Sequence, residues 1–193
     1  MTRKDILIFQ LREARNEFLN ALDDLTQEQL VARPIPERNN IGWIFCHCLN
    51  NFDFFIQQRQ TNESLMTKDG KYGKLAIYGR KPPVEDNPPP DFTGLSGALD
   101  EVLGACIDII DGLNEEALGN LSPYWHHKNF ESTAGNCVRV INHSNAHLRQ
   151  IWLLRGALGD KNHWPGQTLY KKSNEERGKF YVPDREKILA DRK

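Results

Sequence analysis

The stretch that decides the fold is a polar segment that reads Asn142-His143-Ser144-Asn145-Ala146-His147-Leu148-Arg149-Gln150-Ile151-Trp152-Leu153-Leu154-Arg155. At about 3.6 residues per helical turn, His143 and His147 lie about 40° apart around a helix and one turn apart along it. Two imidazoles on one face can bind one metal ion, which needs at least a third protein ligand. The other histidine inside a strongly helical pattern is His47, so the prediction of a site depends on whether these three side chains meet.

The length and charge of the chain limit the classes of function. With 193 residues it falls within the range of one domain, and it is long enough to bury a core without disulfides. Its 25 Lys and Arg residues nearly balance 26 Asp and Glu residues, which gives a net charge of -1. This balance disfavours nucleic acid and acidic membranes as partners. As the partner we expect a small-molecule substrate.

The cysteine pattern predicts reduced thiols and a cytoplasmic protein. The spacing of the four cysteines is not that of a small secreted scaffold, and the N-terminal residues lack the apolar run of a signal peptide. No run of 18 apolar residues occurs, so we expect no membrane span. Cys46 and Cys48 flank His47, but side chains one position away on a helix splay by about 100°, which argues against a shared metal ion. We interpret both as packing residues.

Apolar residues recur at helical spacing in four long segments, which cover residues 2–25, 39–60, 95–113 and 132–159. Thr26 and Gln29 have the spacing of a capping box and predict a short helical turn before Pro34. For the second and third long helices, the expected N-caps are Asn39 or Asn40 and Ser96. Ser132 or Thr133 is expected to cap the fourth.

Four amphipathic helices without a strand-rich region predict an all-α protein with a four-helix bundle. We expect a single domain in which residues 1–159 form the bundle and residues 160–193 form a C-terminal extension that packs on it. Residues 61–93 are rich in Gly, Lys and Pro and form a long loop after the second helix. This loop is long enough to cross the bundle, so the helix order need not be up-down-up-down.

His47 shares a helix face with bulky apolar residues, so we expect it to point toward the core. His143 and His147 share a face with Val140, Ile151 and Leu154. Three neutral imidazoles bind Zn²⁺ or a similar ion and leave positions open for water or substrate. The alternative is that each histidine only hydrogen-bonds within the bundle or lies at its surface. Burying three imidazoles without a partner would be costly, which favours the metal site.

Other polar side chains are candidates for substrate binding. Asn51 lies one turn after His47 and can orient a ligand, although a hydrogen bond within the core is the simpler role. His126 and His127 lie in a connector beside Tyr124, where surface histidines are the alternative. Arg149 can bind a carboxylate, against the alternative of surface or interhelical pairing.

The segments 41–47 and 142–155 resemble the second and last bundle helices of the DinB-like (YfiT-like) family of metal-binding four-helix bundles. The resemblance covers about residues 4–159. It implies that one histidine of the second helix and two histidines four apart on the last helix bind a divalent ion, which His47, His143 and His147 match. Residues 160–193 depart from the family pattern, and the 61–93 loop looks longer than usual.

The resemblance also implies a range of functions. The family includes thiol S-transferases that use bacillithiol or mycothiol, a few isomerase or hydrolase-like enzymes, and many proteins without known activity. It therefore implies a divalent transition metal such as zinc or nickel, a low-molecular-weight thiol and a homodimer. Our leading hypothesis is a metal-dependent enzyme that activates a small thiol or water for S-transfer or hydrolysis. The rival hypothesis is a non-enzymatic stress-response or binding protein with a structural or vestigial metal site.

Overall fold

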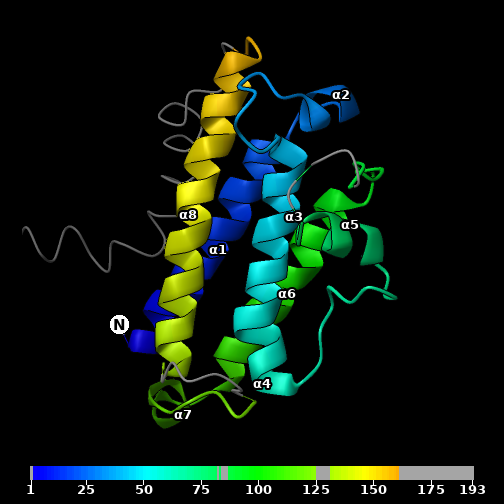
Figure 1. Cartoon of the computed structure of the whole chain (residues 1–193). Helices are drawn as coiled ribbons and strands as arrows, with labels where there is room; N and C mark the ends of the chain where they lie inside the picture. Colours follow the sequence, from blue (N-terminus) through cyan, green and yellow to red (C-terminus); the bar gives the residue numbers. More distant parts are fainter. Residues whose placement is uncertain (1, 82, 84–86, 125–130, 161–193) are drawn as a thin grey trace, which may run out of the picture.

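The computed structural model describes residues 2–81, 83, 87–124 and 131–160. Four long helical segments dominate it (Figure 1). These are α1 (Arg3–Leu22), the run of α3 (Ile41–Phe52), the π-helix η1 (Asp53–Gln58) and α4 (Arg59–Thr61), then α6 (Leu95–Gly112) and α8 (Thr133–Ala157). The short helices are α2 (Gln27–Val31), α5 (Gly73–Tyr78) and α7 (Glu115–Gly119). The all-α prediction is confirmed.

The four long segments form a bundle in which the second and third run in the same direction (Figure 1). Helices α1 and α6 are antiparallel, because Arg3 near the start of α1 pairs with Glu115 after the end of α6, while Arg15 pairs with Asp100 near its start. The connection through residues 62–94, with α5, carries the chain back along the bundle. The order is therefore up-down-down-up, in line with the expectation that a long loop crosses the bundle.

Side-chain caps fix several helix starts where the sequence predicted them. Thr26 and Gln29 form the reciprocal capping box at the start of α2. The side chain of Asn40 accepts a hydrogen bond from the Trp43 amide at the start of α3. Ser132 caps α8 in the same way. Each cap satisfies an N–H group that the helix itself leaves without a partner.

Other local predictions need correction. Ser96 is not the cap of the third long helix, because α6 already begins at Leu95 and the preceding residue, Gly94, makes no side-chain cap. The 61–93 loop is not structureless, because its residues Gly73–Tyr78 form α5, which includes the apolar run that begins at Lys74. The connector before α8 contains α7, which is capped by Asn114 and was not predicted. The proposed packing of residues 160–193 falls outside the described residues, apart from Asp160.

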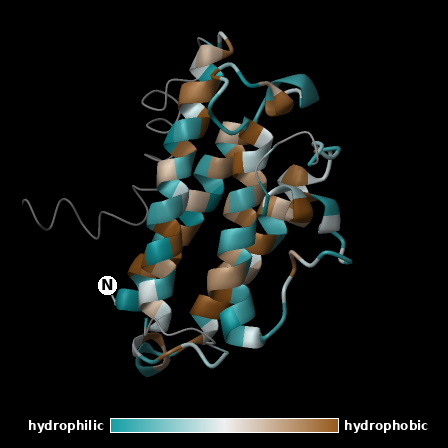
Figure 2. Cartoon of the chain, viewed as in Figure 1, coloured by the Kyte–Doolittle hydropathy of each residue, from teal (hydrophilic) through white to brown (hydrophobic). Residues whose placement is uncertain are grey.

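The core lies between the four long segments, each of which contributes buried apolar residues. Apolar and polar residues are interspersed along these segments (Figure 2). Phe18 of α1 packs edge-on against Phe45 and Phe52 of α3, with ring centroids 5.9 and 6.3 Å apart. Helix α3 is buried on nearly all sides, because α5 and its flanking loops cover the side that faces away from α1. His47, Asn50 and Asn51 are the less buried positions of this helix.

Arg155 near the end of α8 is buried and connects α8 to the end of α1 by hydrogen bonds. Only 2% of it is exposed, and its Nη1 donates to the carbonyl oxygens of Ala21 and Asp23, each at 2.8 Å. Its Nη2 also forms an ion pair with Asp160 at 2.6 Å. This cation therefore fixes the end of α8 against the end of α1.

Candidate metal centre

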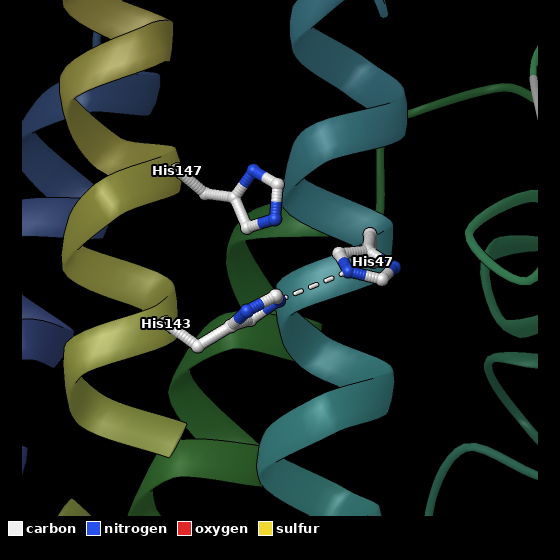
Figure 3. A group of neighbouring side chains, drawn as sticks. All are labelled: His47, His143 and His147. Carbon is white, nitrogen blue, oxygen red and sulfur yellow. Dashed lines mark hydrogen bonds between the residues drawn. The ribbon is translucent and has the colours of Figure 1, made fainter. Parts of the chain in front are cut away.

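The three predicted histidines converge in the seam between α3 and α8 (Figure 3). His47 comes from the middle of α3, whereas His143 and His147 project from successive turns of α8. One ligand atom from each residue lies within 4.8 Å of the others. The closest pair is Nε2 of His47 and Nε2 of His143, which lie 3.1 Å apart.

The burial of the cluster differs from the prediction. His47 is half-buried and does not face the core. It lies on the side of α3 that faces the seam with α8, whereas nearly all other sides of α3 are covered by neighbouring elements. His143 is exposed and His147 is half-buried, so both lie at the edge of the buried stripe of α8. The site is therefore accessible from outside the bundle.

The His47 ring is held on two sides. The indole of Trp43, one turn earlier, stacks on it with centroids 4.7 Å apart and planes inclined by 10°. Nδ1 lies 3.3 Å from the carbonyl oxygen of Gly79. A carbonyl oxygen only accepts, so Nδ1 carries the hydrogen and the lone pair of Nε2 is directed to the cluster.

Gly79 can supply this carbonyl because it packs directly on the backbone of α3. A Cβ atom at this position would lie 2.4 Å from the carbonyl carbon of Cys46 and 2.6 Å from the backbone nitrogen of His47. Both distances are far below van der Waals contact. The absence of a side chain at Gly79 thus allows the end of α5 to orient the ligand.

His147 is oriented by a hydrogen bond in the same way. Its Nδ1 lies 3.0 Å from Oε1 of Gln150, which can only accept a hydrogen bond. The hydrogen is therefore on Nδ1, and Nε2 is left as an acceptor. A hydrogen bond from the ring nitrogen remote from the metal is a common way to fix the orientation of metal-binding histidines.

Asn51 fills the space between two of the imidazoles. Its Nδ2 lies 3.0 Å from Nε2 of His47 and 3.4 Å from Nε2 of His143, and it donates to the His47 carbonyl oxygen at 2.9 Å. The amide N–H group is directed to a point where imidazole lone pairs converge. A metal cation requires the same convergence of lone pairs. The donor set, imidazole nitrogens with half-open access, fits a divalent transition metal.

The protonation of the cluster also suits a metal. Burial, followed by the nearby His147, lowers the pKa of His47 to about 4, although the Gly79 carbonyl opposes this shift. Burial and His147 also lower the pKa of His143. Both rings are therefore neutral at pH 7, and metal binding needs the neutral form.

A comparison with protein families agrees with this geometry. Residues 10–151 match the DinB superfamily, a segment that holds all three histidines. This chain belongs to the DinB superfamily. No curated protein matches it. The family resemblance inferred from the helix motifs is thus confirmed. Membership of the superfamily does not by itself identify the reaction that a protein catalyses.

A pocket of about 450 Å³ opens beside His47 of this DinB-superfamily chain. It is lined by residues of α3, of η1 and of the segment that follows α5, most of which have polar side chains. These are His47, Asn50, Asn51, Asp53, Phe54, Gln58, Gly79 and Arg80. Part of the wall is a π-helix, a rare geometry that is frequent at functional sites.

Of the other predicted site residues, the structure brings Asn51 to the cluster and leaves Arg149 outside. Arg149 is exposed and lies about 200° around the helix from His147, so it points to another side of α8. His126 and His127 lie outside the described residues. Gly79 and Arg80 were missed, because they follow a weakly patterned loop and no sequence spacing connects them with His47.

Cys46 and Cys48 are not part of the cluster. Both thiols are free and buried on the sides of α3 that pack against the protein interior. Burial raises the pKa of both thiols, so they stay protonated at neutral pH and are poor metal ligands. The prediction of packing cysteines agrees with this burial.

Proposed function

We propose that this DinB-superfamily protein is a metal-dependent enzyme in which His47, His143 and His147 hold a divalent ion such as zinc or nickel. The ion would activate a small thiol or water for S-transfer or hydrolysis. The observation that carries the proposal is the convergence of one ligand atom from each histidine within 4.8 Å. A bound divalent ion supplies Lewis acidity and lowers the pKa of a coordinated thiol or water.

The protein's own groups would set the geometry of this centre. The Gly79 carbonyl and Gln150 hold the Nδ1 hydrogens of His47 and His147, so their Nε2 atoms remain available. The Trp43 ring keeps the imidazole of His47 from rotating out of the seam. Asn51 is close enough to donate to a group bound at the centre once its amide turns from the imidazoles.

An open centre favours catalysis over a structural role. Among the described residues, the cluster has three protein ligands, and a structural zinc site normally has four. Positions beyond the three histidines would be left for a thiol or water. The neighbouring pocket of about 450 Å³ has the size of a small-molecule site, so we expect a small-molecule substrate.

One observation favours a second candidate, a non-enzymatic stress-response or binding protein with a vestigial site. The Nε2 atoms of His47 and His143 lie at hydrogen-bonding distance, and Nδ2 of Asn51 is close enough to donate to one of them, which satisfies part of the cluster without an ion. In that case the three histidines would form a hydrogen-bonded polar contact between α3 and α8. Metal binding separates the two candidates at the first step.

The test is the metal content of protein purified without chelator, measured by inductively coupled plasma mass spectrometry. We expect about one divalent ion per chain, and its loss in His143→Ala and His147→Ala. Asn142→Ala is the matched control, since it changes an exposed side chain beside His143 on the same helix. Equal metal content in the wild type and in both histidine variants would contradict the ligand assignment.

We also propose a cytoplasmic location and a homodimer. The four free, buried cysteines fit a reducing compartment. No helix in the described part of the chain is long and apolar enough to cross a membrane. The homodimer follows from the family resemblance, and sedimentation of the purified protein would test it.

A further inference from the structure

We propose that Arg80 forms a carboxylate-binding subsite in the pocket beside the histidine cluster, so that the substrate is a small molecule with a carboxylate at one end. This deepens the proposed function and rests on it, because the other end of the molecule would meet the metal at His47. The same pocket is lined by His47 and Arg80, which places the two groups within reach of one bound molecule.

Two hydrogen bonds hold the Arg80 side chain in place, and other N–H groups of its guanidinium remain without a hydrogen-bond partner among the described residues. Its Nε donates to Oδ1 of Asn50 at 3.3 Å, and its Nη2 donates to the carbonyl oxygen of Met66 at 2.8 Å. Asn50 is itself fixed, since its Nδ2 donates to the carbonyl oxygens of Cys46 and Ala76. Nη1 makes no hydrogen bond within the described residues, so a positioned guanidinium keeps free N–H groups.

The remaining walls explain why an anion is expected. Asp53 is 2% exposed, and its two carboxylate oxygens accept hydrogen bonds from Ser64 and from the Leu65 amide. This carboxylate is thus buried and hydrogen-bonded, and its charge also attracts Arg80, whose exposed guanidinium keeps N–H groups for a further anion. Gln58 makes no side-chain hydrogen bond within the described residues, so its amide adds a neutral donor to the pocket.

A carboxylate fits this pocket better than a phosphate. Arg80 is the one side chain in the described lining with a full positive charge, and it matches a single negative charge. A phosphate dianion would bring a second negative charge near Asp53 without a second cation. A planar carboxylate also matches the planar fork of a guanidinium, which gives paired hydrogen bonds.

The test uses three probe series of matched length: ω-mercaptocarboxylic acids with two to six carbons, mercapto-alcohols and mercaptoalkyl phosphonates. Their binding to zinc-loaded and metal-free protein is measured by isothermal titration calorimetry. We expect at least one acid to bind zinc-loaded protein about tenfold more tightly than its alcohol, the range for a charge-assisted hydrogen bond. Arg80→Gln should remove this difference while zinc and mercapto-alcohol binding persist.

The controls separate the subsite from the metal. Lys74→Gln removes an exposed cation of α5 outside the pocket lining and should leave the preference intact. Arg80→Lys keeps the charge and should retain part of the preference, and thermal unfolding of each variant checks its folding. If zinc binds but no acid is preferred at any length, the subsite is wrong; a preference for mercaptoalkyl phosphonates would also contradict it. If zinc does not bind at all, the proposed function fails instead.

Discussion

Two polar clusters join the same pair of helical segments, and they differ in how completely their hydrogen bonds are made. At the far end of the seam, Arg59 donates from Nη1 to Oδ1 of Asn136 at 2.5 Å, and Nδ2 of Asn136 donates to the hydroxyl of Ser122 at 3.2 Å. All three side chains are buried. In the middle of the seam, three imidazoles converge with partial exposure beside a pocket. The first cluster stabilises the seam, and the second leaves acceptors for a ligand.

The comparison teaches that polarity alone does not mark a site. Both clusters combine residues about 80 to 100 positions apart in the chain, and both lie between antiparallel helices. In the buried cluster each donor meets an acceptor, so an added ion or ligand would gain little. In the histidine cluster, the Nε2 atoms of His47 and His143 lie 3.1 Å apart and can share one hydrogen, while Nε2 of His147 is left as an acceptor, so lone pairs remain for a cation. If this contrast holds, a change in the buried cluster should cost stability alone, and a change around the histidines should also alter zinc binding.

Asn136→Ala should give the largest loss of stability. It removes the acceptor of a buried guanidinium and leaves the Arg59 charge without this partner, which costs about 2–3 kcal/mol. Urea unfolding of metal-free protein measures this loss. Zinc affinity, measured by competition with a chromogenic chelator, should stay unchanged. A stable variant with weakened zinc binding would reverse the roles assigned to the two clusters.

Gly79→Ala should affect both stability and metal binding. The added Cβ would lie 2.4 Å from the backbone of α3, so α5 must move and the Gly79 carbonyl must leave His47. We expect a loss of about 1–3 kcal/mol, typical of overpacking, and about tenfold weaker zinc binding. Gly104→Ala is the matched control, since a Cβ there meets open space. Equal zinc affinity in both variants would show that the carbonyl does not orient the ligand.

The stability of the metal-free protein should fall as the pH drops from about 6.5 to about 4. In this window the unfolded chain binds a proton at His47 that the folded state does not, because the folded pKa is lowered to about 4. Stability therefore rises with pH through the window. His47→Asn should flatten the curve of unfolding free energy against pH, measured by urea unfolding. An unchanged slope in that variant would mean that His47 is not the group responsible.

Arg149→Ala should have the smallest effect. The side chain is exposed and turned away from the cluster, so stability should change by less than about 0.5 kcal/mol. Zinc affinity and binding of the mercapto-acids should equal those of the wild type in the same assays. A clear loss of acid binding would restore Arg149 as a substrate-binding residue and weaken the assignment to Arg80.

The sequence predicted most of the features that depend on local physics. Asn40 and Ser132 are predictable caps, because their side chains satisfy amides two or three residues away. The pair of histidines one turn apart on α8 follows from helix geometry, and His47 was chosen as the third because it lies in another strongly helical pattern; the family resemblance agreed with this choice. These signals depend on neighbours in the chain, so no tertiary structure was needed.

The features that were missed depend on contacts between distant segments. The π-helix of η1 changes the register of the second segment, which an α-helical pattern does not reveal. His47 was expected to face the core because it shares a helix face with bulky apolar residues. That pattern does not show that α5 packs on α3 and buries another of its sides. Gly79 and Arg80 reach the site only through the fold of the connection after α4, and nothing in the spacing of residues 62–94 predicts that approach.

X-ray absorption of the zinc-loaded protein distinguishes an open three-histidine metal centre from a closed one. We expect three imidazole nitrogens at about 2.0–2.1 Å together with oxygen from solvent. Scattering from sulfur at about 2.3 Å in the absence of added thiol, or from a fourth imidazole, would contradict an open three-histidine centre.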